Sequence, residues 1–106
     1  MNSGMQNRHI TASEARAMMK RNPSAIILDV RTEQEFATGR IPGAILLPDH
    51  DIHEKAKHLL PNYNALILVY CRSGIRSRSA VSLLVSMGYN NVYDFGGITN
   101  WPYEKV

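Results

Sequence analysis

Short apolar runs alternate along this chain with segments whose apolar residues recur at helical spacing. Four runs rich in aliphatic and β-branched residues predict strands over residues 25–30, 44–47, 66–70 and 91–95. These runs do not show the alternating polar pattern of a half-exposed strand, so we expect strands covered on both faces. Because helical segments separate them, the pattern predicts a three-layer α/β domain with a parallel sheet between helices.

Two of the predicted helices begin at a capping box, in which a threonine is followed three residues later by a glutamate. Thr11 with Glu14 and Thr32 with Glu35 have this spacing. The first helix should run to the Asn-Pro pair at residues 22–23. The second should be short and end at Gly39, because glycine commonly terminates helices.

Two further helices are predicted by apolar residues on one face. One covers residues 49–60, and the other follows residue 74 and stops at Gly88. Their predicted inner faces hold Ile52, Ala56, Leu59 and Leu60 in the first, and Ala80, Leu83, Leu84 and Met87 in the second. Serines 79, 82 and 86 lie on the opposite face of the second helix.

Composition narrows the function classes. The chain has 106 residues, 44% of them hydrophobic and 20% charged, as in an ordinary single globular domain. The net charge of +3 is spread along the chain without an aromatic-rich basic stripe, so we expect no nucleic-acid partner. The longest apolar run, over residues 65–71, is far shorter than the about 20 residues that cross a bilayer, so we expect no membrane partner.

The first eight residues are polar and lack the apolar stretch of a secretory signal. We therefore predict a flexible tail over residues 1–8 and one domain over residues 9–106. The single cysteine fits a reducing compartment, so we expect a cytoplasmic protein.

That cysteine, Cys71, ends the most strand-like run and is followed by Arg72, Arg76 and Arg78. In open parallel sheets, ligands bind at the carboxyl ends of the strands. The alternative is an inert core cysteine beside a solvated basic turn. Polar neighbours make burial beyond the strand end unfavourable, so we favour a reactive thiol at an exposed strand end.

The residues after Cys71 favour its thiolate form. A helix that begins near residue 75 offers unpaired backbone N–H groups and the positive end of its dipole. Gly74 can adopt the angles that turn successive N–H groups inward, and Arg72 and Arg76 add fixed positive charge. A thiolate is the nucleophilic form of cysteine.

The segment Cys71-Arg72-Ser73-Gly74-Ile75-Arg76 resembles the active-site loop of the rhodanese, or sulfurtransferase, family. Three other segments are similar to the family's motifs in the same order: LDVR at 28–31 with EF at 35–36, GRIPGA at 39–44, and GG at 96–97 with Trp101. Arg40 stands where the family usually has histidine. These blocks lie between residues 28 and 101, and the resemblance extends over residues 10–103.

The resemblance implies a rhodanese-like domain with a central, mostly parallel five-stranded sheet and helices on both faces. It implies sulfur transfer through a Cys71 persulfide, from thiosulfate or a similar small anion to cyanide or a thiol, without a cofactor. A thioredoxin-like or sulfur-carrier protein is an expected acceptor. The implied substrate-binding residues are Arg72, Ser73, Gly74, Ile75, Arg76 and Ser77. Asp29, Arg31 and Glu35 are expected to support the loop.

Three alternatives remain open. Cysteine-dependent phosphatases and arsenate reductases of the same fold resemble the loop, but five residues separate their cysteine and arginine, whereas four separate Cys71 from Arg76. A non-catalytic binding module would usually lack the cysteine. A metal site at His50, His53 and His58 has no recognised spacing, so we expect no metal.

Overall fold

The computed structural model describes residues 7–106, and most of the tail predicted over residues 1–8 lies outside the described residues. Four strands form one sheet in the order β2-β1-β3-β4: β1 (Ile26–Asp29), β2 (Ile45–Leu46), β3 (Ile67–Cys71) and β4 (Val92–Gly97). Every pairing between these strands is parallel. The predicted parallel α/β architecture is therefore confirmed.

The prediction of five strands is not borne out in the described part of the chain. Beside β4, where a further strand would pair, there is a single parallel bridge between His9 and Asp94. Backbone hydrogen bonds on both sides of the bridge join Arg8 and Ile10 to Asp94. The chain then enters α1 at Ala12, so the contact does not extend into a strand.

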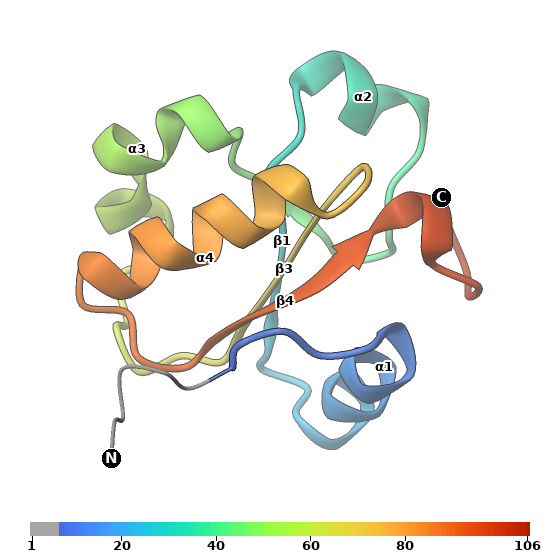
Figure 1. Cartoon of the computed structure of the whole chain (residues 1–106), viewed down its shortest axis with the longest axis horizontal. Coiled ribbons are helices and arrows are strands. Elements are labelled where there is room, and N and C mark those ends of the chain that lie inside the picture. Colours follow the sequence, from blue (N-terminus) through green and yellow to red (C-terminus); the bar gives the residue numbers. More distant parts are fainter. Residues whose placement is uncertain (1–6) are drawn as a thin grey trace.

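Helices cover both faces of the sheet (Figure 1). On one face α3 (Ile52–Leu59) and α4 (Ile75–Ser86) pack over a core that includes Leu28, Val69 and Leu84. On the other face α1 (Ala12–Arg21) and the C-terminal segment with Trp101 enclose a second core around Leu68 and Tyr70. Strand β3 is buried along its whole length, because it lies between these two layers.

Both predicted capping boxes are present, and each fixes the start of a helix. Thr11 and Glu14 hydrogen-bond reciprocally at the start of α1, and Thr32 and Glu35 do so at the start of α2 (Glu33–Thr38). Gly39 is the C-cap of α2, as predicted. The predicted helix over residues 49–60 is divided into a 3-10 turn (Asp49–Asp51) and α3, and Leu59 is partly exposed rather than on the buried face.

The order of elements brings two loops together at the carboxyl end of the sheet. Helix α2 follows β1, and the loop at residues 72–74 follows the central strand β3. Figure 1 shows both at the same end of the sheet. The site described below lies where they meet.

Candidate functional site

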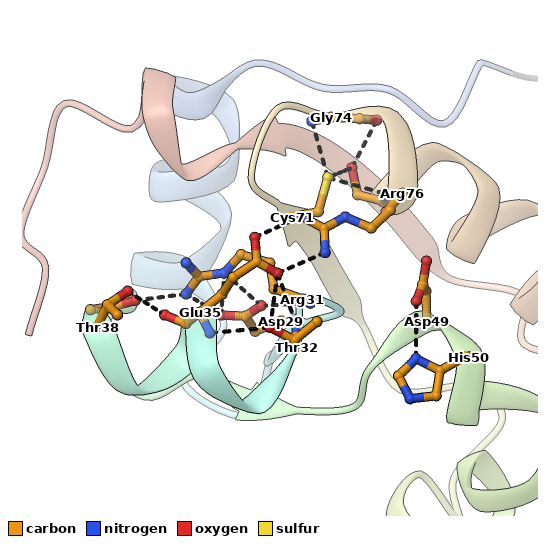
Figure 2. Close-up of polar contacts among 12 residues, drawn as sticks. Asp29, Arg31, Thr32, Glu35, Thr38, Asp49, His50, Cys71, Gly74 and Arg76 are labelled. Atoms are coloured by element: carbon orange, nitrogen blue, oxygen red, sulfur yellow. Dashed lines mark hydrogen bonds and ion pairs between the residues drawn. The ribbon is translucent and has the colours of Figure 1, made fainter.

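Cys71 is the last residue of β3, and its sulfur lies against the start of α4 (Figure 2). The Gly74 N–H donates to Sγ over 3.0 Å and the Ser77 N–H over 3.3 Å. Both donors belong to the N-terminal turn of α4, where N–H groups have no partner within the helix and the helix dipole is positive. Two backbone donors at the positive end of the helix dipole therefore point at the sulfur.

The sequence also predicted an exposed thiol, and that prediction is wrong for this structure. Cys71 is only 1% exposed. Gly74 adopts a left-handed conformation with φ of 104°, and its N–H points at the sulfur. The thiol consequently lies beneath the loop, while Arg72, Ser73 and Ile75 are exposed around it. Ile75 is 76% exposed, which is unusual for a large apolar side chain.

The glycine pair at the end of β4 lets the loop pack tightly onto the sheet. In the sheet register Gly97 pairs with Cys71. A Cβ atom on Gly97 would overlap the carbonyl oxygen of Arg72 and crowd the Cα of Ser73. That carbonyl accepts hydrogen bonds from the N–H and the Oγ1 of Thr99. The backbone on either side of the loop is therefore fixed against the C-terminal segment.

Arg76 forms a two-pronged ion pair with Glu35 of α2 (Figure 2). Nη1 donates to Oε1 over 2.7 Å and Nη2 to Oε2 over 2.9 Å. The hydrogen bonds from Arg76 lower the pKa of Glu35 to about 2. The hydrogen bonds to Glu35 raise the pKa of Arg76, and the charges of Cys71 and Asp49 add to this effect. A fixed guanidinium thus lies near the sulfur.

Asp29 and Arg31 form a second, deeply buried ion pair. Nε and Nη2 of Arg31 donate to both carboxylate oxygens of Asp29, with a shortest distance of 2.7 Å. Nη2 also donates to the Gly39 carbonyl over 2.6 Å. This pair joins the end of β1 to the end of α2. It therefore supports the helix that carries Glu35, and its hydrogen bonds do not reach residues 72–77.

The Cys71 sulfur belongs to a polar network with Ser77, Asp94 and His9, and of these three partners the sequence pointed only to Ser77. The Ser77 hydroxyl is fully buried and lies 2.6 Å from Oδ1 of Asp94 and 3.5 Å from Sγ of Cys71. Asp94 Oδ2 lies 3.0 Å from Nδ1 of His9. The available signal was Asp94 itself, a carboxylate within the otherwise apolar run that forms β4.

The remaining histidines do not assemble a metal site in the described residues. His50 lies near Asp49 and Asp51 on the surface. No group of three or more histidine, cysteine, aspartate or glutamate side chains within residues 7–106 is arranged to hold a metal ion. Within the same residues, no helix is long and apolar enough to cross a membrane.

Comparison with known proteins places this geometry in a family. The family model of the rhodanese-like domain matches residues 11–103. Thiosulfate sulfurtransferase PspE of Escherichia coli is 32% identical over 79 residues, which cover 74% of this chain and 76% of that protein. A sulfurtransferase of Allochromatium vinosum is 38% identical over 77 residues, covering 72% and 70%. The solved structure of rhodanese with anions from E. coli superposes with a TM-score of 0.73 at 30% identity, covering 77% of this chain and 96% of that one.

Proposed function

This chain belongs to the rhodanese-like domain family, and from that premise we propose that it transfers a sulfane sulfur through a persulfide on Cys71. The donor is thiosulfate or a similar small anion, and the acceptor is cyanide or a thiol. Relatives named as thiosulfate sulfurtransferases support the donor class. The observation that carries the proposal is the pair of N–H groups, from Gly74 and Ser77, that donate to the Cys71 sulfur.

The first half of the reaction uses the thiolate as nucleophile. The Cys71 sulfur attacks the outer sulfur of thiosulfate, and a new S–S bond forms. The original S–S bond breaks, and its electron pair leaves with sulfite. No general base is needed at this step once the thiolate is present. The terminal sulfur of the persulfide carries the negative charge, which N–H donors and the helix dipole stabilise in the same way as a thiolate.

The second half regenerates the thiolate. A nucleophilic acceptor attacks the terminal sulfur, the persulfide S–S bond breaks, and Cys71 leaves with the electron pair. The acceptor carries the sulfur away as thiocyanate, when it is cyanide, or as a new persulfide, when it is a thiol. Atoms and charge balance over the two halves without any cofactor.

The loop residues contribute to binding in different ways. Arg76 uses two of its N–H groups on Glu35, and the remaining donors of the guanidinium suit an oxyanion. Arg72 and Ser73 are exposed beside the sulfur, where they can meet the sulfonate oxygens. The solved E. coli relative is described as a rhodanese with anions, which supports an anionic donor.

The proposed cellular acceptor is a small thiol or a thioredoxin-like or sulfur-carrier protein. Ile75 supports this proposal, because a side chain that is 76% exposed at the active loop offers an apolar contact to such a partner.

Mass spectrometry of the protein after treatment with thiosulfate tests the proposal. We expect a gain of one sulfur atom that maps to Cys71 and disappears on addition of cyanide, with thiocyanate as the product. Cys71→Ser should acquire no sulfur and should not turn over. Serine is close to cysteine in size and its hydroxyl can accept from the same Gly74 and Ser77 N–H groups, so the free energy of unfolding should change little. A wild-type protein that folds but never gains sulfur would refute the proposed activity and favour a non-catalytic binding module.

A further inference from the structure

A continuous hydrogen-bonded path connects the buried Cys71 sulfur to solvent on the far side of α4's first turn. It runs from Sγ to the Ser77 hydroxyl over 3.5 Å and from there to Oδ1 of Asp94 over 2.6 Å. Asp94 Oδ2 then meets Nδ1 of His9 over 3.0 Å. Cys71, Ser77 and Asp94 are each at most 3% exposed, whereas the His9 side chain is 52% exposed.

The path ends at a surface hollow of about 370 Å³ whose lining includes Arg8, His9, Arg78, Ser82 and Asp94. The exposed residues of the catalytic loop, such as Arg72 and Ile75, do not line this hollow. Solvent thus reaches the end of the path at a place separate from the loop surface where a sulfur donor would approach. The charged groups that line the hollow around His9 are Asp94, Arg8 and Arg78, and the charge of Arg76 interacts with that of Cys71.

The hydrogen bonds along the path have a definite direction. The Ser77 hydroxyl has one proton, and Asp94 Oδ1 is its shortest contact. The carbonyls of Gly74, at 3.1 Å, and Gly96, at 3.4 Å, are longer. With its proton directed at Asp94, Ser77 Oγ can accept from the Cys71 thiol. The Gly96 N–H also donates to Asp94 Oδ1 over 2.9 Å, which holds the carboxylate in place.

A buried carboxylate in a strand is costly unless its charge is compensated. Asp94 gains compensation from Ser77, Gly96 and His9 together, and it is the residue through which the sulfur and the histidine communicate. The sulfur-transfer steps described above use none of these side-chain contacts. They begin from a thiolate, however, and a thiol under a closed loop needs a route by which its proton can leave.

We propose that Ser77, Asp94 and His9 form a proton relay that ionises Cys71. The S–H bond breaks with its electron pair left on sulfur, and the proton passes to Ser77 Oγ as the Ser77 proton passes to Asp94 Oδ1. When His9 is protonated and paired with the Asp94 carboxylate, arrival of the proton on Asp94 removes the counter-charge of the imidazolium, and the other ring nitrogen of His9 releases its proton to water. In the product state the Asp94 carboxyl donates to Ser77, and the Ser77 hydroxyl donates to the thiolate. Ser77, Asp94 and His9 carry the proton in this scheme, which rests on the nucleophilic Cys71 of the proposed function.

The relay is tested by following the ultraviolet absorbance of the thiolate against pH, with Cys71→Ser as the subtracted baseline. This readout needs neither thiosulfate nor access of a reagent to the sulfur. The absorbance can therefore show a failed relay in a protein that still transfers sulfur, and an intact relay in a protein that does not. The variants are Asp94→Asn and His9→Gln. Asp51→Asn and His50→Gln are matched controls, because both residues lie on the surface away from the path.

For Asp94→Asn we expect thiolate formation to move to higher pH by about one unit, because an amide cannot take the thiol proton. If Asp94 acts only through its negative charge, its removal favours the thiolate and moves the transition to lower pH. A downward shift or no shift would overturn the relay.

His9→Gln gives an independent test at a half-exposed side chain, so it remains informative if Asp94→Asn does not fold. Without His9 the thiol proton stays on Asp94 and is not released to water. We therefore expect the thiolate fraction to lose the part of its pH dependence that comes from proton release at His9. Retention of the wild-type pH dependence would overturn the relay. Both control variants should follow the wild-type curve.

Discussion

Arg76 and Glu35 lie 41 positions apart in sequence and form a two-pronged ion pair that fastens the first turn of α4 to α2. The pair is partly exposed, with about a quarter to a third of each side chain open to solvent. Within residues 7–106, this is the one ion pair that joins α4, which begins just after Cys71, to α2. Both helices start at the carboxyl end of the sheet.

The ion pair predicts a specific acid sensitivity. The pKa of Glu35 is lowered in the folded protein from 4.5 to about 2, because Arg76 stabilises its carboxylate. A depressed folded-state pKa contributes stability that is complete above about 4.5 and is lost as the pH falls to about 2. Solvent exposure reduces the contribution, and we expect about 1–2 kcal/mol. Urea unfolding at several pH values measures it.

In that experiment Glu35→Gln should be less stable than wild type at neutral pH, and the difference should vanish near the acid end of the window. Glu33→Gln, a neighbouring exposed carboxylate of α2, is the matched control and should remain close to wild type throughout. A Glu35→Gln deficit that persists unchanged at acid pH would show that the ion pair is not its cause.

Arg76→Ala should weaken the binding of thiosulfate much more than it destabilises the folded protein. Loss of the guanidinium removes charge-assisted hydrogen bonds to the anionic donor, so we expect KM for thiosulfate to rise about tenfold or more. The free energy of unfolding should fall only by the about 1–2 kcal/mol assigned to the Glu35 pair. Steady-state kinetics over a range of thiosulfate concentrations, beside urea unfolding, measures both quantities.

Arg21→Ala, at the exposed end of α1, is a control for net charge. If stability collapses while KM stays unchanged, Arg76 is a structural brace.

Local patterns in the sequence were sufficient to predict most of the fold. The capping boxes at Thr11 and Thr32 are short-range hydrogen-bond motifs, so both helix starts were read directly from the chain. The four strands were found for a similar reason, because a strand between two helical layers is mostly apolar. The fifth strand came only from family resemblance. At that position the chain makes one bridge, at His9, before α1 begins.

The site was predicted less completely, because its key contacts join distant segments. Cys71, Gly74 and Arg76 lie in one loop and were identified together. That Arg76 would pair with Glu35, or Ser77 with Asp94, depends on how β1, β3 and β4 are arranged side by side. The burial of Cys71 was missed because it depends on the close packing of the loop on Gly97 of β4, a contact between distant segments.

The short loop predicts discrimination against phosphate substrates. Four residues separate Cys71 from Arg76, one fewer than in the phosphatases that the loop resembles. Within residues 7–106, the backbone N–H groups that reach the sulfur are those of Gly74 and Ser77, at the start of α4. We therefore expect turnover with thiosulfate and cyanide and no measurable hydrolysis of an aryl phosphate by the same preparation. Turnover of the phosphate alone would assign the loop to the phosphatase chemistry instead.

Because Gly97 has no side chain, the loop at residues 72–74 packs directly on β4 beside Cys71. A methyl group there would overlap the Arg72 carbonyl, which lies in the backbone and cannot swing aside as a side chain can. Gly97→Ala should therefore move the loop, at a cost of about 1–3 kcal/mol in the free energy of unfolding. The displacement also pulls the Gly74 N–H from Cys71, so we expect a lower kcat/KM for thiosulfate and a shift of the thiolate transition to higher pH.

Gly43→Ala is the matched control, because φ at Gly43 is 84° and the turn lies outside the loop. It should lose stability through backbone strain yet keep the wild-type thiolate transition. If Gly97→Ala folds and retains both the wild-type thiolate transition and the wild-type kcat/KM, close packing of the loop on β4 does not favour the thiolate.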